Sequence, residues 1–429
     1  MKLADIIDTF ISGDWGEESP TLDTPNAAYC VRGADIVPIT NHNFTGIPQR
    51  YVCDRTKETK LLAVGDLVIE KSGGSPTQST GRIVYVSEDL IKAKGNVVCS
   101  NFCTAFRVKD GWNPLYVYYF WQNVYNHDAF FNFEGKTSGI KNLQLDNALS
   151  AIDIEYLPLE KQNQIIASLA SIDEKIKVNR QINDNLEAMA KQLYDYWFVQ
   201  FDFPNEEGKP YKSSGGAMVW NERLKREIPI DWTCCSIKEM CDINKKTINK
   251  DEHKQIEYLD TGSITQGHIS NTEIYSVDMA PSRAQRKVED LSILYSSVRP
   301  RLLHYGILST PKENFIVSTG FVTLDAKCKK MALMVYYFLT SNTITEHLAS
   351  IADTAVSSYP SISPDDIAYL DIVIPSNDII QKYNDIVEPM FRKMSTLRKE
   401  IDSLTKQRNE LLPLLMNGQA SVNYHLSDD

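Results

Sequence analysis

The sequence lacks the residue pairs that usually hold structural metal ions. It has eight cysteines and seven histidines in 429 residues, but no Cys-x-x-Cys pair and no histidine pair at metal-ligand spacing. Structural zinc sites are usually built from such pairs, so we predict no metal site in this chain. Because disulfide frameworks are typical of secreted proteins, we expect the thiols to be reduced, in a reducing compartment.

Long apolar runs are also missing. No run approaches the roughly 20 residues that cross a membrane, and Asp5 and Asp8 interrupt the first apolar stretch, which is untypical of a secretory signal. Hydrophobic residues make up 42% of the chain and charged residues 24%, as in ordinary globular proteins. We therefore expect a cytoplasmic protein of two or three domains without a membrane partner.

Positive charge is scarce. The formal net charge is −11, which argues against non-specific binding of polyanions, because such binding requires a broad basic surface. A DNA-binding function would need local basic patches, or partners that supply the positive charge.

Several enzyme signatures are absent together. The sequence contains no Gly-x-x-x-x-Gly-Lys-Ser/Thr loop, no Gly-x-Gly-x-x-Gly turn and no His-Glu-x-x-His pair. Asn113-Pro114-Leu115-Tyr116 is similar to the Asn-Pro-Pro-Tyr loop of adenine-N6 methyltransferases, with Leu115 in place of the second proline. We interpret Pro114 instead as the first residue of a helix. We predict no catalytic residues and no bound cofactor.

What the chain does have is an internal repeat. Val117-Tyr118-Tyr119-Phe120 recurs half a chain length later as Val335-Tyr336-Tyr337-Phe338, and Ser100 and Ser318 keep the same offset. A repeat that fills the chain predicts a circular arrangement with pseudo-twofold symmetry. Proteins with twofold symmetry can recognise two half-sites in DNA, although duplicated halves also form enzymes and carriers.

Each half combines an α+β domain with a long heptad helix. We predict α+β domains over 1–155 and 216–375, a helix with a polar linker over 156–215, and a C-terminal helix over 376–429. Leu61–Leu62-Ala63 and Leu67-Val68-Ile69 are expected to be strands, as are 82–86 and 96–100. The aromatic residues of 116–121 have helical spacing, which favours a core position over base stacking.

Both helices carry apolar or small residues at alternating steps of four and three, the coiled-coil period. Pro389 implies either a kink in the second helix or a short helix before it. The predicted seam and partner-docking positions are Ile165, Leu169, Ile172, Ile176, Asn179, Asn183, Leu186, Leu193 and Trp197 in the first helix, and Val387, Met390, Met394, Leu397, Ile401, Leu404, Leu411 and Leu415 in the second.

The repeat predicts how the helices pair. If a twofold axis relates the halves, the helices are antiparallel and a globular domain lies at each end of the pair. The alternative is two ordinary amphipathic helices, each packed on its own domain.

Four loops combine cations with small, flexible residues. They cover 71–82, 136–142, 299–306 and 357–361, at comparable positions of the two halves. Glycine allows backbone N–H groups to approach phosphates, and arginine and glutamine can pair with base edges; the alternative is an ordinary polar surface. The predicted DNA-contacting residues are Lys71, Gly73, Gly74, Gln78, Arg82, Lys136, Ser138, Lys141, Asn142, Arg299, Arg301, His304, Ser357 and Tyr359.

Several motifs resemble those of the specificity subunits of Type I restriction-modification systems, and they occur in the same order as in that family. The run 157–166 is similar to the Leu-Pro-Pro-Leu-x-Glu-Gln-x-x-Ile entry of their conserved helix, and 201–216 is similar to their central conserved region. Ile228-Pro229-Ile230-Asp231-Trp232 and Leu411-Leu412-Pro413-Leu414-Leu415 also match the family pattern. Ile374-Pro375-Ser376 departs from it, because the second helix entry lacks the Glu-Gln pair.

The resemblance implies a non-catalytic DNA-recognition subunit. Each of two target-recognition domains would recognise half of a split, asymmetric site, and the helices would set the spacer. Two methyltransferase subunits would dock on the helices and use S-adenosylmethionine, and two restriction subunits would use ATP and magnesium. The alternatives are a self-contained adenine-N6 methyltransferase and a duplicated scaffold that binds no DNA.

Overall fold

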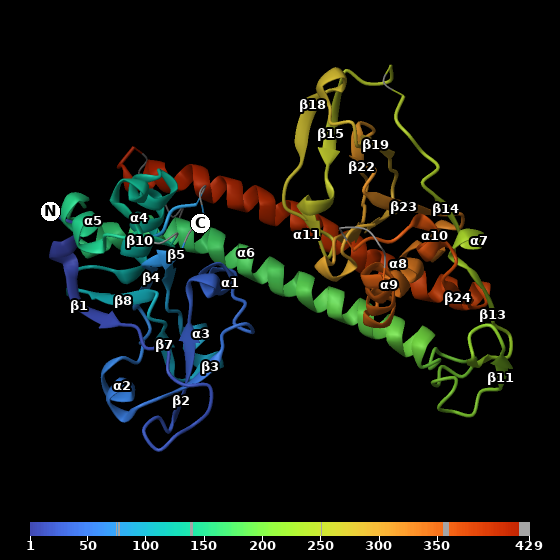
Figure 1. Cartoon of the computed structure of the whole chain (residues 1–429), viewed down its shortest axis with the longest axis horizontal. Coiled ribbons are helices and arrows are strands. Elements are labelled where there is room, and N and C mark those ends of the chain that lie inside the picture. The colour runs from blue at the N-terminus through green and yellow to red at the C-terminus, as the bar shows by residue number, and fades with distance from the viewer. Residues whose placement is uncertain (74, 76–77, 138–139, 250, 355–359, 420–429) are drawn as a thin grey trace, which may run out of the picture. The chain divides into compact units, whose positions relative to one another are not determined.

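A computed structural model describes residues 1–73, 75, 78–137, 140–249, 251–354 and 360–419. The chain divides into two compact units (Figure 1). Unit 1 combines Met1–Arg180 with Lys399–Asp429, and unit 2 is Gln181–Arg398. Arg180 and Arg398 occupy equivalent positions of the sequence repeat, so the structural division follows the repeat.

Unit 1 is built on two sheets and a projecting hairpin. A four-stranded antiparallel sheet has the order β1 (Ile7–Ser12), β8 (Cys103–Val108), β4 (Leu67–Glu70), β6 (Ile83–Tyr85). A second sheet has the order β3 (Gln49–Val52), β2 (Asn26–Val31), β7 (Val97–Cys99), in which β2 and β7 are parallel. The third consists of β5 (Ser72–Gly73), β10 (Ile140–Leu143) and β9 (Glu134–Thr137).

Unit 2 repeats the strand order of the first two sheets and adds one strand, β19, to the second. Its first sheet has the order β14 (Cys241–Ile243), β23 (Phe321–Ala326), β20 (Ile293–Ser296), β21 (Tyr305–Ile307). Its second has the order β18 (Glu273–Ser276), β15 (Gln255–Leu259), β22 (Phe315–Ser318), β19 (Ala284–Lys287), and β15 and β22 are parallel. The smaller sheets pair β11 (Met218–Asn221) with β12 (Arg226–Pro229), β13 (Thr233–Ser236) with β24 (Asp371–Ile374), and β16 (Ile264–Thr265) with β17 (His268–Ile269). Since the main sheets share their strand order, the internal repeat is confirmed.

Each unit also contains several shorter α-helices. In unit 1 they are α1 (Ile36–Thr40), α2 (Asp54–Thr59), α3 (Glu88–Lys94), α4 (Pro114–Asn126) and α5 (Leu145–Ala151). In unit 2 they are α7 (Ile237–Met240), α8 (Ala332–Leu339), α9 (Asn342–Thr354) and α10 (Pro364–Ala368). The side chain of Asn113 caps α4, and Pro114 is its first residue, as predicted. Tyr116 and Trp121 are buried, which confirms that the aromatic group belongs to the core.

Two long helices run through both units. The first, α6, covers Leu159–Tyr194 and continues into one π-helical turn over Asp195–Val199. The second, α11, covers Asn377–Met416 without interruption at Pro389, so no separate short helix precedes it. Gly418 follows the end of α11 with φ +66°, a left-handed conformation that suits glycine after a helix.

The long helices pair in opposite directions within each unit. In unit 1, Arg408 binds Asp173 at 2.8 Å and Lys175 binds Glu400 at 2.6 Å. In unit 2, Arg398 Nη2 lies 3.6 Å from Glu187, and the rings of Trp197 and Tyr383 are 5.8 Å apart. Positions rise along one helix as they fall along the other, so the pairing is antiparallel in both units.

The predicted seam positions are buried or half-buried. The pair also packs on the domain of each unit: Leu169 and Leu412 join the core that contains Tyr116, and Val387 joins the core that contains Tyr337. Within each unit the helices therefore pair with each other and also pack on the domain. The two arrangements that the sequence offered as alternatives are both present.

Two sequence expectations about local structure are wrong. Leu61–Leu62-Ala63 is not a strand, and only Leu67–Glu70 forms one. The polar segment after α6 is not an open linker, because Phe203 stacks on Tyr211 and Trp232 at 4.6 and 4.8 Å. The glycines and prolines of this segment predict an open loop, but the burial of its aromatic side chains keeps it packed.

Candidate nucleic-acid interface

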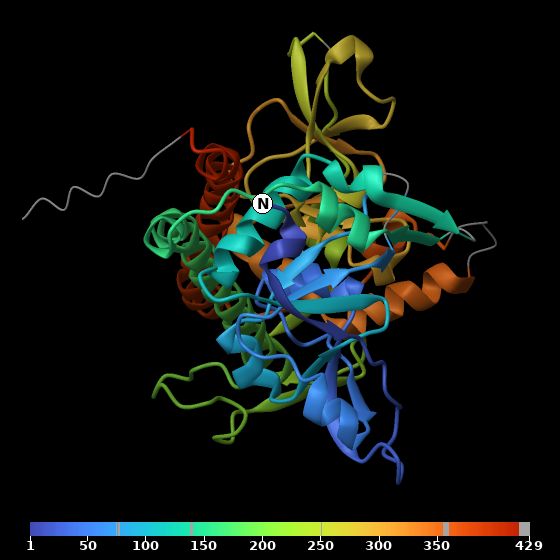
Figure 2. The same cartoon turned by 90° about the vertical axis from the view of Figure 1, so that its left-hand side faces the viewer.

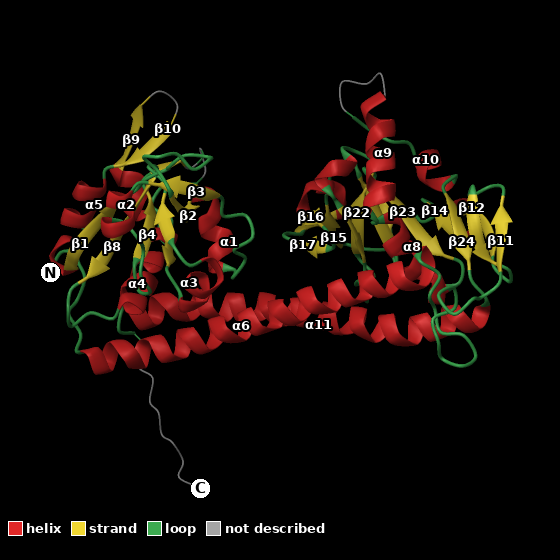
Figure 3. Cartoon of the chain, turned by 90° about the horizontal axis from the view of Figure 1, so that it is seen from below, coloured by secondary structure: helices red, strands yellow, loops and turns green. Residues whose placement is uncertain are grey.

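In unit 1 the structure brings two predicted contact loops together. Lys141 of β10 pairs with Gly73 of β5, and Asn142 pairs with Ser72. The β9–β10 hairpin projects from the side of unit 1 opposite α6 and α11 (Figures 2 and 3). The two loops, distant in sequence, therefore form one surface on that side.

In unit 2 the two remaining loops also meet. The Arg299 N–H donates to the carbonyl of Pro360 at 3.0 Å, and Val298 forms a bridge with Ser361. Helix α9, which precedes 355–359, projects from unit 2 on the side opposite α6 and α11 (Figure 3). Gly74, Ser138, Ser357 and Tyr359 lie outside the described residues, as does the side chain of Lys136.

The cations at the base of the unit 1 surface have partners within the chain. Arg82 forms two hydrogen bonds with Glu70, at 2.8 and 2.6 Å. Lys141 binds Glu134 at 3.0 Å and the carbonyl of Gln78 at 3.3 Å. Asn142 accepts a hydrogen bond from Ser72 Oγ. These contacts favour a supporting role for Arg82 and Lys141, and their contact with DNA stays a prediction.

The carboxylates themselves were not predicted as site residues. Burial tends to raise the pKa of Glu134, but hydrogen bonds from Thr80 and Lys141 together outweigh it, and the pKa is lowered. The only sequence signal for Glu70 was an acid at the end of the buried strand Leu67–Glu70. A buried carboxylate needs a partner, so this position could have been singled out.

Lys71 and Gln78 are the more accessible positions in unit 1. Gln78 is exposed. Lys71 is half-buried and lines a hollow of about 550 Å³ with Phe10 and Thr104. The exposed aromatic side chains of Phe10 and Phe102 were not predicted from the sequence; the carbonyl of Phe102 accepts the N–H of Lys71 at 2.8 Å.

The predicted contacts of unit 2 are more open. Arg301 pairs with Glu346 at 3.2 Å and Asp353 at 3.4 Å, and its side chain remains half-exposed. Such exposed pairs contribute little and can exchange for phosphate. Arg299 is exposed, with φ +47°. Burial lowers the pKa of His304, although Asp260 opposes the shift, so this imidazole is neutral at pH 7 and suits hydrogen bonding.

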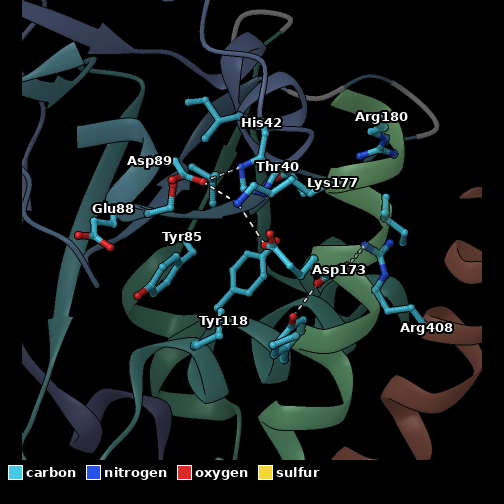
Figure 4. Close-up of a pocket in the computed structure, with 18 of the residues that line it drawn as sticks. Thr40, His42, Tyr85, Glu88, Asp89, Tyr118, Asp173, Lys177, Arg180 and Arg408 are labelled. Carbon is cyan, nitrogen blue, oxygen red and sulfur yellow. Dashed lines mark hydrogen bonds and ion pairs between the residues drawn. The ribbon is translucent and has the colours of Figure 1, made fainter. Parts of the chain in front are cut away.

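A pocket lined by both polar and apolar side chains lies between the domain of unit 1 and the long helices (Figure 4). It has a volume of about 470 Å³. Lys177 of α6 binds Asp89 at 2.8 Å, and Arg180 donates to Asn41 at 2.6 Å. The Lys177 ammonium lowers the pKa of Asp89.

Unit 2 has contacts of the same kind. Arg392 forms two hydrogen bonds of 2.6 Å with Asp290, and Arg398 donates to the carbonyl of Gly267 at 2.8 Å. Arg180 and Arg398 are repeat equivalents, so the same helix position anchors the domain of each unit.

The two helix entries differ as the sequence indicated. Gln162 is fully buried; it accepts the N–H of Asn113 at 2.8 Å and donates to the carbonyls of Gly111 and Leu157. The repeat position in the second half is the buried Ile380. Asn113 is therefore engaged in capping α4 and binding the start of α6, which argues against a methyltransferase loop.

Two features are absent from the part of the chain that the structure describes. None of the helices in this part of the chain is long and apolar enough to cross a membrane. No group of three or more His, Cys, Asp or Glu side chains is arranged to hold a metal ion among the same residues.

The fold and the loop surfaces define a duplicated α+β protein with paired helices. A model of the Type I restriction modification DNA specificity domain matches residues 37–188 and 229–411. The chain belongs to this family.

Named relatives agree with this assignment. The chain is 25% identical over 324 residues to the Type I restriction enzyme MjaIX specificity subunit of Methanocaldococcus jannaschii, covering 73% of this chain and 71% of the relative. It is 25% identical over 178 residues to the HindI specificity subunit of Haemophilus influenzae, covering 41% and 39%. The crystal structure of a Type-I restriction-modification system S subunit from M. genitalium has a TM-score of 0.56 and 15% identity, covering 97% of this chain and 95% of that one, and thus shares the fold.

Proposed function

We propose that this chain is the sequence-specific DNA-recognition subunit of a Type I restriction-modification complex. Each unit recognises one half of a bipartite, asymmetric site. The observation that carries the proposal is that predicted contact loops from distant parts of the sequence meet in each unit. The hairpin of unit 1 and helix α9 of unit 2 each project away from the paired helices (Figure 3).

The two half-sites should differ in sequence. Unit 1 presents a β-hairpin, β9–β10, where unit 2 presents the helix α9. The loop cations of unit 1 pair with buried carboxylates, whereas Arg301 of unit 2 pairs with exposed ones. Because the two units share a fold but present different contact surfaces, they are suited to recognise different base sequences.

Chemistry belongs to the partners in this proposal. Two methyltransferase subunits dock on the long helices and bring S-adenosylmethionine, and two restriction subunits bring ATP and magnesium. The helices set the unrecognised spacer between the half-sites. Because the net charge is −11, the partners supply much of the phosphate contact. The complex works in the cytoplasm, on double-stranded DNA.

The test is methylome sequencing of cells that express a methyltransferase partner with or without this chain. We expect N6-methyladenine in one split motif only when the chain is present. Methylation of DNA by the chain alone would support a self-contained methyltransferase. Failure of the complex to modify any motif would support a scaffold without a DNA function.

A further inference from the structure

A buried ion pair closes the connection between β4 and β6 in unit 1. Glu70, the last residue of β4, has a side chain that is 3% exposed, and the Arg82 side chain is 18% exposed. Arg82 donates Nε and Nη2 to the two carboxylate oxygens, at 2.8 and 2.6 Å. A two-pronged pair of this kind fixes both the distance and the relative orientation of its groups.

The backbone is shaped around this carboxylate. A Cβ atom on Gly33 would lie 2.4 Å from Glu70 Oε1, and one on Gly73 would lie 2.5 Å from it. Gly73 also has φ +147°, which side chains disfavour. Two glycines from separate segments thus leave the space that the carboxylate fills.

The neighbouring residues of the connection are held as well. Glu134 Oε1 accepts the N–H of Thr80 at 2.7 Å and its hydroxyl at 3.1 Å. Trp121 donates to the carbonyl of Gly81 at 2.7 Å, and Tyr125 donates to that of Ser79 at 3.0 Å. The end of the connection is therefore held by contacts within unit 1.

Unit 2 has the same backbone hydrogen bond at this position but a different side-chain contact. The N–H of Ser296 donates to the carbonyl of His304 at 2.9 Å, as the N–H of Glu70 does to Arg82 at 2.9 Å. Ser296 and His304 are therefore the structural counterparts of Glu70 and Arg82. Ser296 Oγ instead accepts the N–H of Val298 at 3.2 Å.

We propose that Glu70 and Arg82 are positioning residues for the half-site recognised by unit 1. The pair holds the described ends of the connection, residues 71–73 and 78–81, in the conformation that recognises bases, without contacting DNA itself. Its burial keeps the Glu70 charge away from phosphate, and its bonding geometry sets where the connection leaves the sheet. The inference rests on the proposed function, and it assigns base selectivity at one half-site to residues beneath the contact surface.

Glu70→Gln tests this inference, because glutamine keeps the shape of the side chain and removes its charge. Arg82→Lys is the second variant, since it keeps the charge and loses the two-pronged geometry. Each variant is expressed with the methyltransferase partner, and the methylome gives the ratio of methylated cognate sites to methylated single-base variants. We expect this ratio to fall about tenfold or more at one half of the motif, with the other half and the spacer unchanged.

The matched control is Glu88→Gln, which removes an exposed pair with Lys92 in the same unit. It should leave the motif as in the wild type. Wild-type selectivity in both Glu70→Gln and Arg82→Lys would overturn the inference and leave the proposed function intact. Equal loss of both half-sites would also overturn it, because the pair would then be a requirement of folding. Absence of any motif with the wild-type chain would instead refute the proposed function, and the inference with it.

Discussion

Arg408 of α11 donates to the carboxylate of Asp173 of α6 at 2.8 Å, and the Tyr119 hydroxyl of α4 donates to the other oxygen of that carboxylate at 2.6 Å. One acid thus connects three helices of unit 1. Asp173 is half-buried, as is the guanidinium it binds. The pairing of the long helices and their attachment to the domain therefore share this contact.

Asp173→Asn should destabilise unit 1. The carboxylate holds two donors, and its neutralisation weakens both bonds, so we expect the free energy of unfolding to fall by about 1–3 kcal/mol. Urea denaturation measures the change. Glu400→Gln, which removes the more exposed pair with Lys175, is the control and should cost at most about 1 kcal/mol. Equal costs would show that Asp173 has no special role.

His42 should make the stability of unit 1 depend on pH. Burial lowers the pKa of His42, with Lys177 and Arg180 adding to the shift while Asp89 and Glu174 oppose it. Since the folded state disfavours the protonated ring, stability is complete above the ordinary value of about 6.5 and falls as the pH drops through the lower folded value. His42→Asn should remove this dependence in denaturation curves measured between about pH 5 and 8. An unchanged dependence in the variant would assign it to another group.

Asn179 and Asn183 lie buried in the seam, and within the described residues Asn179 Nδ2 and Asn183 Oδ1 have no hydrogen-bond partner. Asn179→Leu should raise the free energy of unfolding by about 1–2 kcal/mol. The exposed Asn185 is the control, and Asn185→Leu should change stability by less than about 0.5 kcal/mol. A loss of stability on Asn179→Leu would mean that the amide has a partner in solution.

If the asparagines fix helix register, the variant should also tolerate more than one spacer length.

Arg301 should contribute to one half-site only. Its pairs with Glu346 and Asp353 are exposed, so the guanidinium can exchange them for DNA. If Arg301 contacts a base, Arg301→Ala should weaken binding of the half-site of unit 2 by about 1–3 kcal/mol and relax its specificity at that base. If it contacts a phosphate, the variant should weaken DNA binding by a similar factor for all sequences. Methylome motifs of the variant distinguish these cases. Altered bases in the half-site recognised by unit 1 would contradict the division of roles.

The sequence predicted those features that repeat along the chain. Apolar positions every three to four residues identified α6 and α11, because burial along a seam imposes that period. Glycines and cations between apolar runs indicated the four candidate contact segments, and their contact with DNA stays a prediction; one of them, 136–142, lies largely within strands β9 and β10. The sequence also indicated that the start of α11 differs from the start of α6. The structure explains this difference, because the buried position held by Gln162 in the first half is held by Ile380 in the second.

The remaining features depend on contacts between distant segments. Nothing in the local pattern around Glu70 shows that Gly33 leaves space for its carboxylate. The strand expected at 61–63 does not form, although the N–H of Leu62 donates to the carbonyl of Val97 in β7 at 2.8 Å, because one such bond does not make a ladder. Such contacts, which decide how the loops are held, required the structure.

The most direct test of the account concerns the helices, which are continuous across the boundary between the units. Four residues, about one helical turn, are inserted after Asn183, and the methylome of the resulting complex is sequenced. We predict that both half-sites keep their bases while the spacer between them lengthens. Changed bases in either half-site with an unchanged spacer would contradict the claim that the units recognise sequence and the helices set the distance.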